Sequence, residues 1–250
     1  LKMRISPPHE RRKRPTKLNI GPRHRHRPAK APTLEAENAL HQAIQSSRVL
    51  ETLRGHAGPF FFLAYSPDGS KLATTGGDDF AKVWDAGTGE ELLTLKGHEG
   101  VTIGIRFSPD GKRLATASHD GTVIVWDAQS GERLLTLSDV GAELTAVQFS
   151  PDGNLLAANG ASDGHIRIWD AKTGEQLRSF LAHEAPMWFV TYDAKGDRLA
   201  TASVDGTAKV WDADTNEELL TLGGHEDVVS RVNFSPDGQR LATSSMKVRV

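Results

Sequence analysis

Apolar and polar residues alternate in short segments along most of the chain from Val49 onward. Residues 103–107 are apolar at alternate positions, which is the pattern of a strand with one buried face. Residues 113–118, 122–126 and 133–137 complete the unit, and Ser-Pro-Asp-Gly, Asp-Gly and Ser-Gly turns separate the four segments. The pattern predicts four short strands joined by three turns in one twisted antiparallel sheet.

This unit repeats with a period in the low forties. Trp-Asp pairs begin at positions 84, 126, 169 and 211, in steps of 42, 43 and 42. Gly-His pairs begin at 55, 97 and 224, with Ala182-His183 as a variant, and Ser-Pro-Asp-Gly turns begin at 66, 108, 150 and 235. A four-stranded sheet cannot bury both of its faces alone, so neighbouring units must stack around an axis as propeller blades.

With these motifs in phase, residues 49–250 resemble the WD-repeat (Trp-Asp repeat) β-propeller family. The resemblance implies an all-β fold, a WD-type β-propeller with four full blades and a partial fifth. The repeats span about 49–85, 91–127, 132–170, 175–212 and 217–250.

The resemblance also implies a hydrogen-bonded tetrad within a blade. Its members are the His of Gly-His, a Ser or Thr of the second strand, the Asp of the next turn and the Trp of the third strand. Repeats 2 and 4 carry the full set, as His98, Ser118, Asp120 and Trp126 and as His183, Ser203, Asp205 and Trp211. The other repeats are incomplete. Repeat 1 has His56, Asp78 and Trp84, but Gly76 stands at the hydroxyl position. Repeat 3 has Asp163 and Trp169, with Ala161 at the hydroxyl position and no Gly-His pair, and repeat 5 has His225. Blades 1 and 3 are therefore expected to depend more on packing.

The fifth repeat differs from the others. No Asp-Gly turn follows Ser245, and no Trp-Asp pair follows before Val250. The segment from Val49 to Leu53 matches a fourth strand and, by the resemblance, should complete the last blade. These pieces could close a five-bladed ring. Since WD-type rings more often have seven blades, we prefer a fragment of a larger propeller.

The residues before the repeats have a different character. Residues 1–32 contain six prolines and few apolar residues, which predicts a disordered basic tail. Residues 33–48 predict a short linker or capping helix, with Thr33 as N-cap and a helical core at 34–47. Eleven of the 30 Lys and Arg residues but one of the 32 acidic residues lie in residues 1–30, so an acidic body follows a basic tail. No apolar stretch approaches the ~18 residues of a membrane-spanning helix, and cysteine is absent.

The candidate chemistry is weak. His and Asp often act together in acid–base catalysis, but here they recur once per blade, which is typical of residues that stabilise the fold. No nucleophile elbow, calcium loop or phosphate loop is present, so we expect no catalytic residue and no cofactor or metal. His24 and His26 could bind a metal, but the adjacent arginines oppose a cation. The cluster Arg11–Arg14 could contact nucleic acid or an anionic membrane surface, although a solvated tail is the simpler interpretation.

These observations favour a protein-interaction scaffold with a protein or peptide partner. A propeller enzyme is the alternative, and it would need convergent polar residues near the axis. The helix at 34–47 followed by residues 48–56 also resembles the join between a signalling module and C-terminal WD repeats in bacterial multidomain regulators such as STAND-type NTPases. We expect a cytoplasmic location.

A partner-binding face can be proposed from the repeat alignment. The fifth residue after each His lies near the start of the first strand, at the end of the blade where partners of this family commonly dock. These residues are Phe61, Ile103, Thr145, Trp188 and Ser230, and His119 belongs to the surround. We expect an apolar patch centred on Trp188 and Phe61, because Trp is a preferred interface anchor. The alternative is that these side chains pack between blades.

Overall fold

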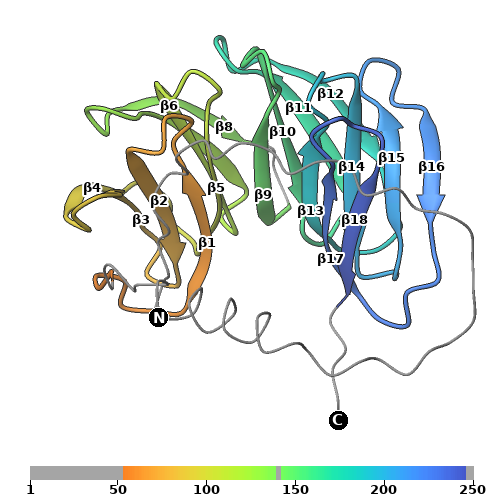
Figure 1. Cartoon of the computed structure of the whole chain (residues 1–250), viewed down its shortest axis with the longest axis horizontal. Helices are drawn as coiled ribbons and strands as arrows, with labels where there is room; N and C mark the ends of the chain where they lie inside the picture. Colours follow the sequence, from red (N-terminus) through yellow and green to blue (C-terminus); the bar gives the residue numbers. More distant parts are fainter. Residues whose placement is uncertain (1–52, 139–141, 246–250) are drawn as a thin grey trace, which may run out of the picture. The chain divides into compact units, whose positions relative to one another are not determined.

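The alternating segments form antiparallel strands throughout the computed structural model (Figure 1). The structure describes residues 53–138 and 142–245. The expected tail at 1–32, the helix at 33–48 and residues 49–52 of the leading strand lie outside the described residues. The described residues are all-β, and none of them forms a helix that could cross a membrane.

Four repeats form complete four-stranded sheets, which we call blades 1 to 4. Blade 1 contains β1 (Phe60–Tyr65), β2 (Lys71–Gly76), β3 (Ala81–Asp85) and β4 (Glu91–Leu95). Blade 2 contains β5 (Thr102–Phe107), β6 (Arg113–Ser118), β7 (Thr122–Asp127) and β8 (Arg133–Ser138). Blade 3 contains β9 (Leu144–Phe149), β10 (Leu155–Gly160), β11 (His165–Asp170) and β12 (Gln176–Leu181). Blade 4 contains β13 (Met187–Tyr192), β14 (Arg198–Ser203), β15 (Ala208–Asp212) and β16 (Glu218–Leu222), and the partial blade 5 contains β17 (Val229–Phe234) and β18 (Leu241–Ser245).

The blades pack through their inner strands in sequence order, β1 on β5, β5 on β9, β9 on β13 and β13 on β17. Each of the three hydrophobic clusters lies between neighbouring blades. The cluster between blades 1 and 2, for example, joins Val83 to Ile105, Leu114 and Trp126. In blades 1 to 4 the second strands are almost fully buried, whereas the fourth strands of blades 2, 3 and 4 expose most of their residues. The inner strands therefore surround an axis, and the outer strands face solvent.

The Ser-Pro-Asp-Gly turns are held by their own side chains. In blade 2 the Ser108 hydroxyl donates to Asp110 Oδ1 at 2.6 Å, and that oxygen also accepts from the backbone N–H of Lys112 at 3.0 Å. These hydrogen bonds lower the pKa of Asp110. Gly111 has a φ of 71°, a left-handed conformation that a side chain disfavours. Sequence and geometry thus agree at this turn.

Candidate partner-binding site

A hydrogen-bonded chain of side chains crosses blade 2 from the turn to the core. The indole N–H of Trp126 donates to Thr116 Oγ1 at 2.9 Å, and Thr116 Oγ1 lies 2.7 Å from His98 Nε2. His98 Nδ1 lies 2.9 Å from Asp120 Oδ2. Because the carboxylate can only accept, the Nδ1–H donates to Asp120. In the neutral imidazole Nε2 is then an acceptor, so the Thr116 hydroxyl donates to it while its oxygen accepts from the indole.

The hydroxyl of this network is not the one expected from the sequence. Ser118 instead donates to the carbonyl of Gly100 at 2.9 Å and accepts from the backbone N–H of Asp120. Ser203 in blade 4 likewise donates to the carbonyl of Pro186. Both serines therefore hold turns, two residues beyond the threonine that contacts the histidine.

Blade 1 has the complete network, contrary to the expectation that it lacks a hydroxyl. Thr74 accepts from the Trp84 indole at 2.8 Å and lies 2.8 Å from His56 Nε2. His56 Nδ1 lies 2.7 Å from Asp78 Oδ1. Blade 4 repeats the arrangement, with Thr201 between His183 and Trp211 and with Asp205 on His183. In blade 5, His225 Nε2 lies 2.8 Å from Thr243 Oγ1.

Blade 3 replaces the network with an ion pair. Ala158 occupies the threonine position and Gly160, rather than Ala161, aligns with Ser118, because this repeat is one residue longer. Asp163 pairs with the buried Arg167 guanidinium through hydrogen bonds to both carboxylate oxygens. Trp169, 1% exposed, lies in the cluster between blades 2 and 3. Blade 3 therefore has no His–Thr–Trp connection.

The histidines of the networks are poor candidates for acid–base catalysis. Burial lowers the pKa of His98 and His183, and the attraction of Asp120 and Asp205 offsets this only in part. The neutral form is therefore the stable one at neutral pH. Since the same contacts recur in blades 1, 2 and 4, they act in folding.

The expected partner-binding face is partly exposed. Trp188 is 43% exposed, and Phe61, Ser230 and His119 are half-buried. Ile103 and Thr145 are buried, at 8% and 2%, which corrects the expectation that they form open surface. Thr145 is held below the surface because it donates to the carbonyl of Met187 and accepts from the Asn159 amide. The apolar patch is therefore centred on Trp188 and Phe61, with Ile103 and Thr145 beneath.

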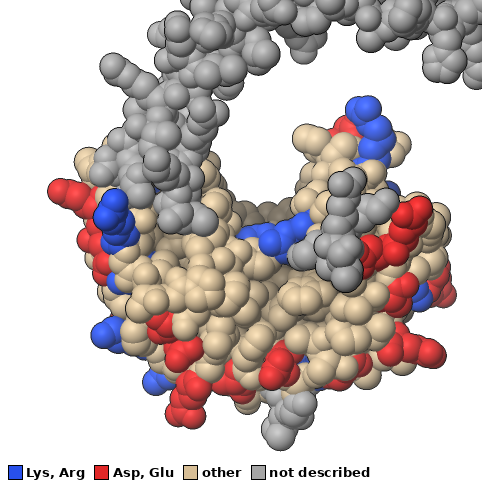
Figure 2. All heavy atoms as spheres, turned by 90° about the horizontal axis from the view of Figure 1, so that it is seen from below, with Lys and Arg blue, Asp and Glu red and all other residues tan. Residues whose placement is uncertain are grey.

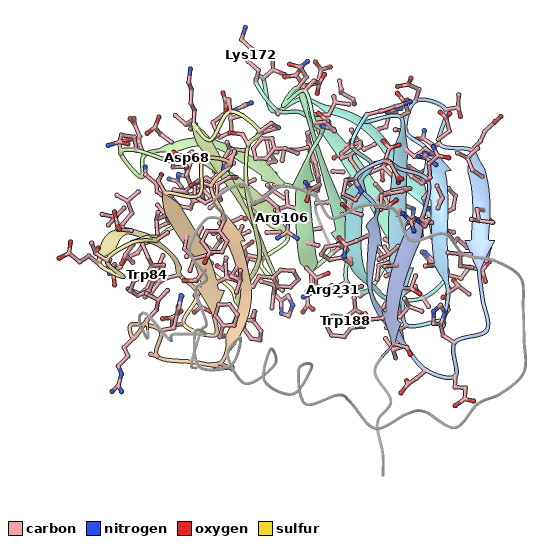
Figure 3. All side chains as sticks on the ribbon, in the orientation of Figure 1. Asp68, Trp84, Arg106, Lys172, Trp188 and Arg231 are labelled. Carbon is pink, nitrogen blue, oxygen red and sulfur yellow. The ribbon has the colours of Figure 1, made fainter. Side chains whose placement is uncertain are left out.

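These residues surround a hollow at one end of the axis, which we call the aromatic hollow. Its volume is about 560 Å³, and all five blades contribute to it. The lining consists of Phe60, Phe61, Phe62, Val101, Ile103, His119, Glu143, Thr145, Ala161, Pro186, Met187, Trp188, Ser230 and Arg231. Figure 2 views the molecule from this end and shows Lys or Arg atoms inside a hollow between the blades. Figure 3 shows Arg231 close to Trp188, with Arg106 farther along the axis.

An aromatic pair and two arginines lie along the axis, and of the two arginines Arg231 lines the aromatic hollow while Arg106 does not. The rings of Phe62 and Phe189 stack with their centroids 6.3 Å apart. The guanidinium of Arg231 lies 4.0 Å from the Phe62 centroid and 4.9 Å from that of Phe189. Arg106 contacts the same two rings at 5.7 and 5.6 Å. Such contacts are favourable cation–π interactions.

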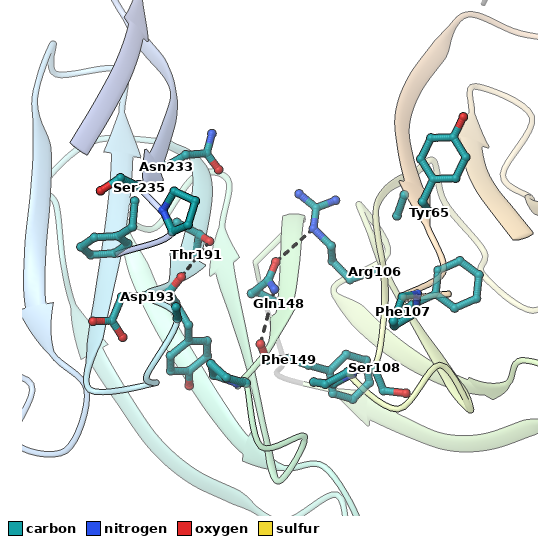
Figure 4. A pocket seen from close by; sticks show the side chains of 18 residues that line it. Tyr65, Arg106, Phe107, Ser108, Gln148, Phe149, Thr191, Asp193, Asn233 and Ser235 are labelled. Carbon is teal, nitrogen blue, oxygen red and sulfur yellow. Dashed lines mark hydrogen bonds between the residues drawn. The ribbon is translucent and has the colours of Figure 1, made fainter. Parts of the chain in front are cut away.

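A second hollow of about 400 Å³ lies at the opposite end of the axis (Figure 4). Arg106 points into it and donates from Nε to Gln148 Oε1 at 3.0 Å. Thr191 and Asn233 from blades 4 and 5 also line it. This polar hollow shares no lining residue with the aromatic hollow. Its Ser108–Asp110 contact recurs in other Ser-Pro-Asp-Gly turns, so it is a turn contact rather than an activated nucleophile.

The two axial arginines had no signal in the sequence. Each stands at an alternating position of an inner strand, where a solvated side chain is the ordinary interpretation. Only the stacking of blades brings β5 and β17 to one axis. Within the described residues no group of three or more His, Asp and Glu side chains could hold a metal ion, and His24 and His26 lie outside those residues.

Comparison with known proteins gives one clear result. Five segments match the family model of the WD domain, G-beta repeat: residues 47–85, 89–127, 131–170, 174–212 and 216–249. They cover well over half of the chain. The comparison with curated proteins gives no significant match.

Proposed function

The chain belongs to the WD domain, G-beta repeat family, whose members are generally protein-interaction scaffolds, and on this premise we propose that it is a non-catalytic scaffold for a protein partner. The partner docks at the aromatic hollow. The observation that carries this proposal is the exposure of Trp188, at 43%, on the rim of a hollow to which every blade contributes. A large aromatic side chain held half in water on a rigid strand is a typical anchor of an interface.

The position of Trp188 distinguishes it from the other exposed apolar residues. Leu92, Leu134, Leu177 and Leu219 are as exposed, but they lie on the outer strands of separate blades, with at most one further exposed leucine on the same strand. Scattered apolar residues of that kind are normal on a protein surface. Trp188, Phe61 and Pro186 instead line one concave surface, where a partner can bury them together.

Affinity capture with matched variants tests this proposal. The chain, Trp188→Ala and Phe61→Ala are immobilised, and bound proteins are quantified by mass spectrometry. Leu219→Ala is the control, because it removes an exposed apolar side chain from an outer strand. We expect the two hollow variants to lose the same set of proteins while the control retains it. Equal recovery by all four folded proteins would refute docking at the hollow.

We further propose that the scaffold is the sensor part of a bacterial multidomain regulator of the STAND NTPase or kinase type, and that it acts in the cytoplasm. The support is the resemblance of residues 34–56 to the join that precedes the repeats in such proteins. An antibody to the repeats should detect the native protein in the cytosolic fraction, at a mass well above 27.1 kDa. Detection in the membrane fraction, or at this mass, would contradict this proposal while leaving the scaffold function intact.

A further inference from the structure

Arg231 places a positive charge inside the aromatic hollow without a negative partner. Its side chain is partly buried, and its guanidinium faces the rings of Phe62 and Phe189. It makes no ion pair or hydrogen bond with any described residue, whereas Arg167 and Arg198 each pair with an aspartate. A guanidinium has five N–H donors, so a ligand that covers Arg231 and displaces water from it must supply hydrogen-bond acceptors, or its binding is unfavourable. The aromatic faces offset only part of that cost.

A second guanidinium increases the positive potential at this place. Arg106 lies on the same aromatic pair, and its hydrogen-bond acceptors are neutral: Gln148 Oε1 and the carbonyl of Ile105. Burial and, secondarily, the charge of Arg231 lower the pKa of Arg106 to about 10, and burial also lowers the pKa of Arg231. Both groups nevertheless remain charged at neutral pH. Arg231, with the charge of Arg106 on the same aromatic rings, therefore attracts an anion into the aromatic hollow.

The rim of the hollow restricts the kind of anion. Trp188, Phe61 and Pro186 present apolar surface around Arg231. Glu143 and His119 also line the hollow, with the Glu143 carboxylate 3.9 Å from His119 Nδ1. A ligand with one carboxylate between apolar groups supplies the negative charge and hydrogen-bond acceptors that Arg231 lacks. Its apolar groups cover the aromatic rim, and it brings no further negative charge close to Glu143. The chain's own basic segment, residues 1–30, has the wrong charge.

We propose that the aromatic hollow binds a peptide segment of the partner protein through one Asp or Glu side chain, whose carboxylate pairs with Arg231 while its apolar neighbours pack on Trp188 and Phe61. This inference rests on the proposed scaffold function and specifies its ligand. The volume of about 560 Å³ accommodates a few side chains of a peptide. A planar guanidinium suits a carboxylate because two parallel N–H groups can meet its two oxygens.

A positional-scanning library of end-blocked hexapeptides tests the proposal without a known partner. One position is fixed in turn as each amino acid, the others are randomised, and binding is followed by the fluorescence of Trp188. Comparing wells that fix Asp or Glu with wells that fix Asn or Gln isolates the effect of the negative charge, because each acid and its amide have nearly the same shape. We expect Asp or Glu to exceed Asn or Gln about tenfold at one position, with apolar residues preferred beside it.

Two arginine variants assign the preference to its residue. Arg231→Met keeps the apolar stem and removes the charge, so it should abolish the acid preference. Arg231→Lys keeps the charge without the planar fork and should retain a weaker preference, which guards against a folding defect. Arg240→Met is the matched control, because Arg240 is 82% exposed and lies outside the aromatic hollow. It should leave the preference unchanged.

The outcomes separate this inference from the scaffold function. A preference for apolar residues without any for acids would overturn the carboxylate proposal and leave docking at the hollow intact. An acid preference that survives in Arg231→Met would also overturn it. Inorganic phosphate should displace a selected acidic peptide far less efficiently than the unlabelled peptide does. If phosphate were equally efficient, a free anion would be the ligand and the peptide proposal would fail.

Discussion

Replacing Thr116 by valine tests whether the buried hydroxyl of blade 2 holds the blade together. The two side chains have nearly the same shape, so the packing of β6 is preserved while the oxygen is lost. Thr116 is fully buried, and its hydroxyl serves both the Trp126 indole and His98 Nε2. Valine leaves these two polar groups without partners where water does not reach them.

The expected cost follows from the number of groups left without partners. A buried donor or acceptor without a partner costs about 1–3 kcal/mol, so two of them should lower the free energy of unfolding by about 2–6 kcal/mol. A typical domain has about 5–15 kcal/mol, so the loss is readily measured. Urea unfolding should show a lower midpoint with an unchanged slope. Ser118→Ala should cost less, because the two groups that Ser118 serves belong to Gly100 and Asp120, which are only half-buried, so water can replace the hydroxyl.

Thr136→Val provides the control, because it makes the same chemical change at an exposed position of β8. Its effect should stay within about 0.5 kcal/mol. If Thr116→Val behaved like this control, the network would contribute nothing to stability. If Ser118→Ala were the more damaging variant, the hydroxyl expected from the sequence would be the relevant one after all.

Three further results are expected. Burial lowers the pKa of His98 and of its equivalent in blade 4, so the stability from their neutral forms is present above pH 6.5 and is lost as pH falls toward the folded pKa. In urea unfolding from pH 7 to 5, the free energy of unfolding should decrease by up to about 1.4 kcal/mol per pH unit for each histidine. A free energy of unfolding that stays constant over this range would contradict the prediction. Gly160→Ser introduces the serine that blades 2 and 4 have at this position, but it should destabilise the protein by about 1–3 kcal/mol, because a Cβ at Gly160 would lie 1.9 Å from Asp163 Oδ1. Gly87→Ser, at an exposed turn, is the control. A Gly160→Ser protein that is more stable than the original would refute this reasoning. Acrylamide should quench one of the five tryptophans, and Trp188→Phe should remove that component, whereas strong residual quenching would show that the other four are accessible.

The fold was more accessible from the sequence than the site. Turn residues and alternation identify strands because their causes are local, and the period of the Trp-Asp pairs gives the stacking. The hydroxyl of the network illustrates the limit of such reasoning. Thr116 and Ser118 lie on the same face of β6, and only the cross-strand register, with Leu114 opposite Trp126, places the threonine within reach of the indole. Recurrence of threonine at 74, 116, 201 and 243 was the available signal.

The binding face shows a second limit. Trp188 and Ile103 occupy equivalent positions in the alignment, yet one is exposed and the other is buried. Both line a hollow to which all five blades contribute, and a single repeat does not contain those neighbours. The same holds for Arg231 and Arg106, whose proximity arises only when five blades share an axis.

The strict succession of strands has a consequence for how the protein is made. Every complete blade is a meander of consecutive strands, so blade 1 has all its residues once Leu95 is synthesised and blade 2 once Ser138 is. Because each inner strand packs on the one before it, a blade emerging from the ribosome finds its neighbour already in place. The chain can therefore fold in the direction of translation, one blade at a time. Truncations at blade boundaries should yield soluble chains more often than truncations within a blade.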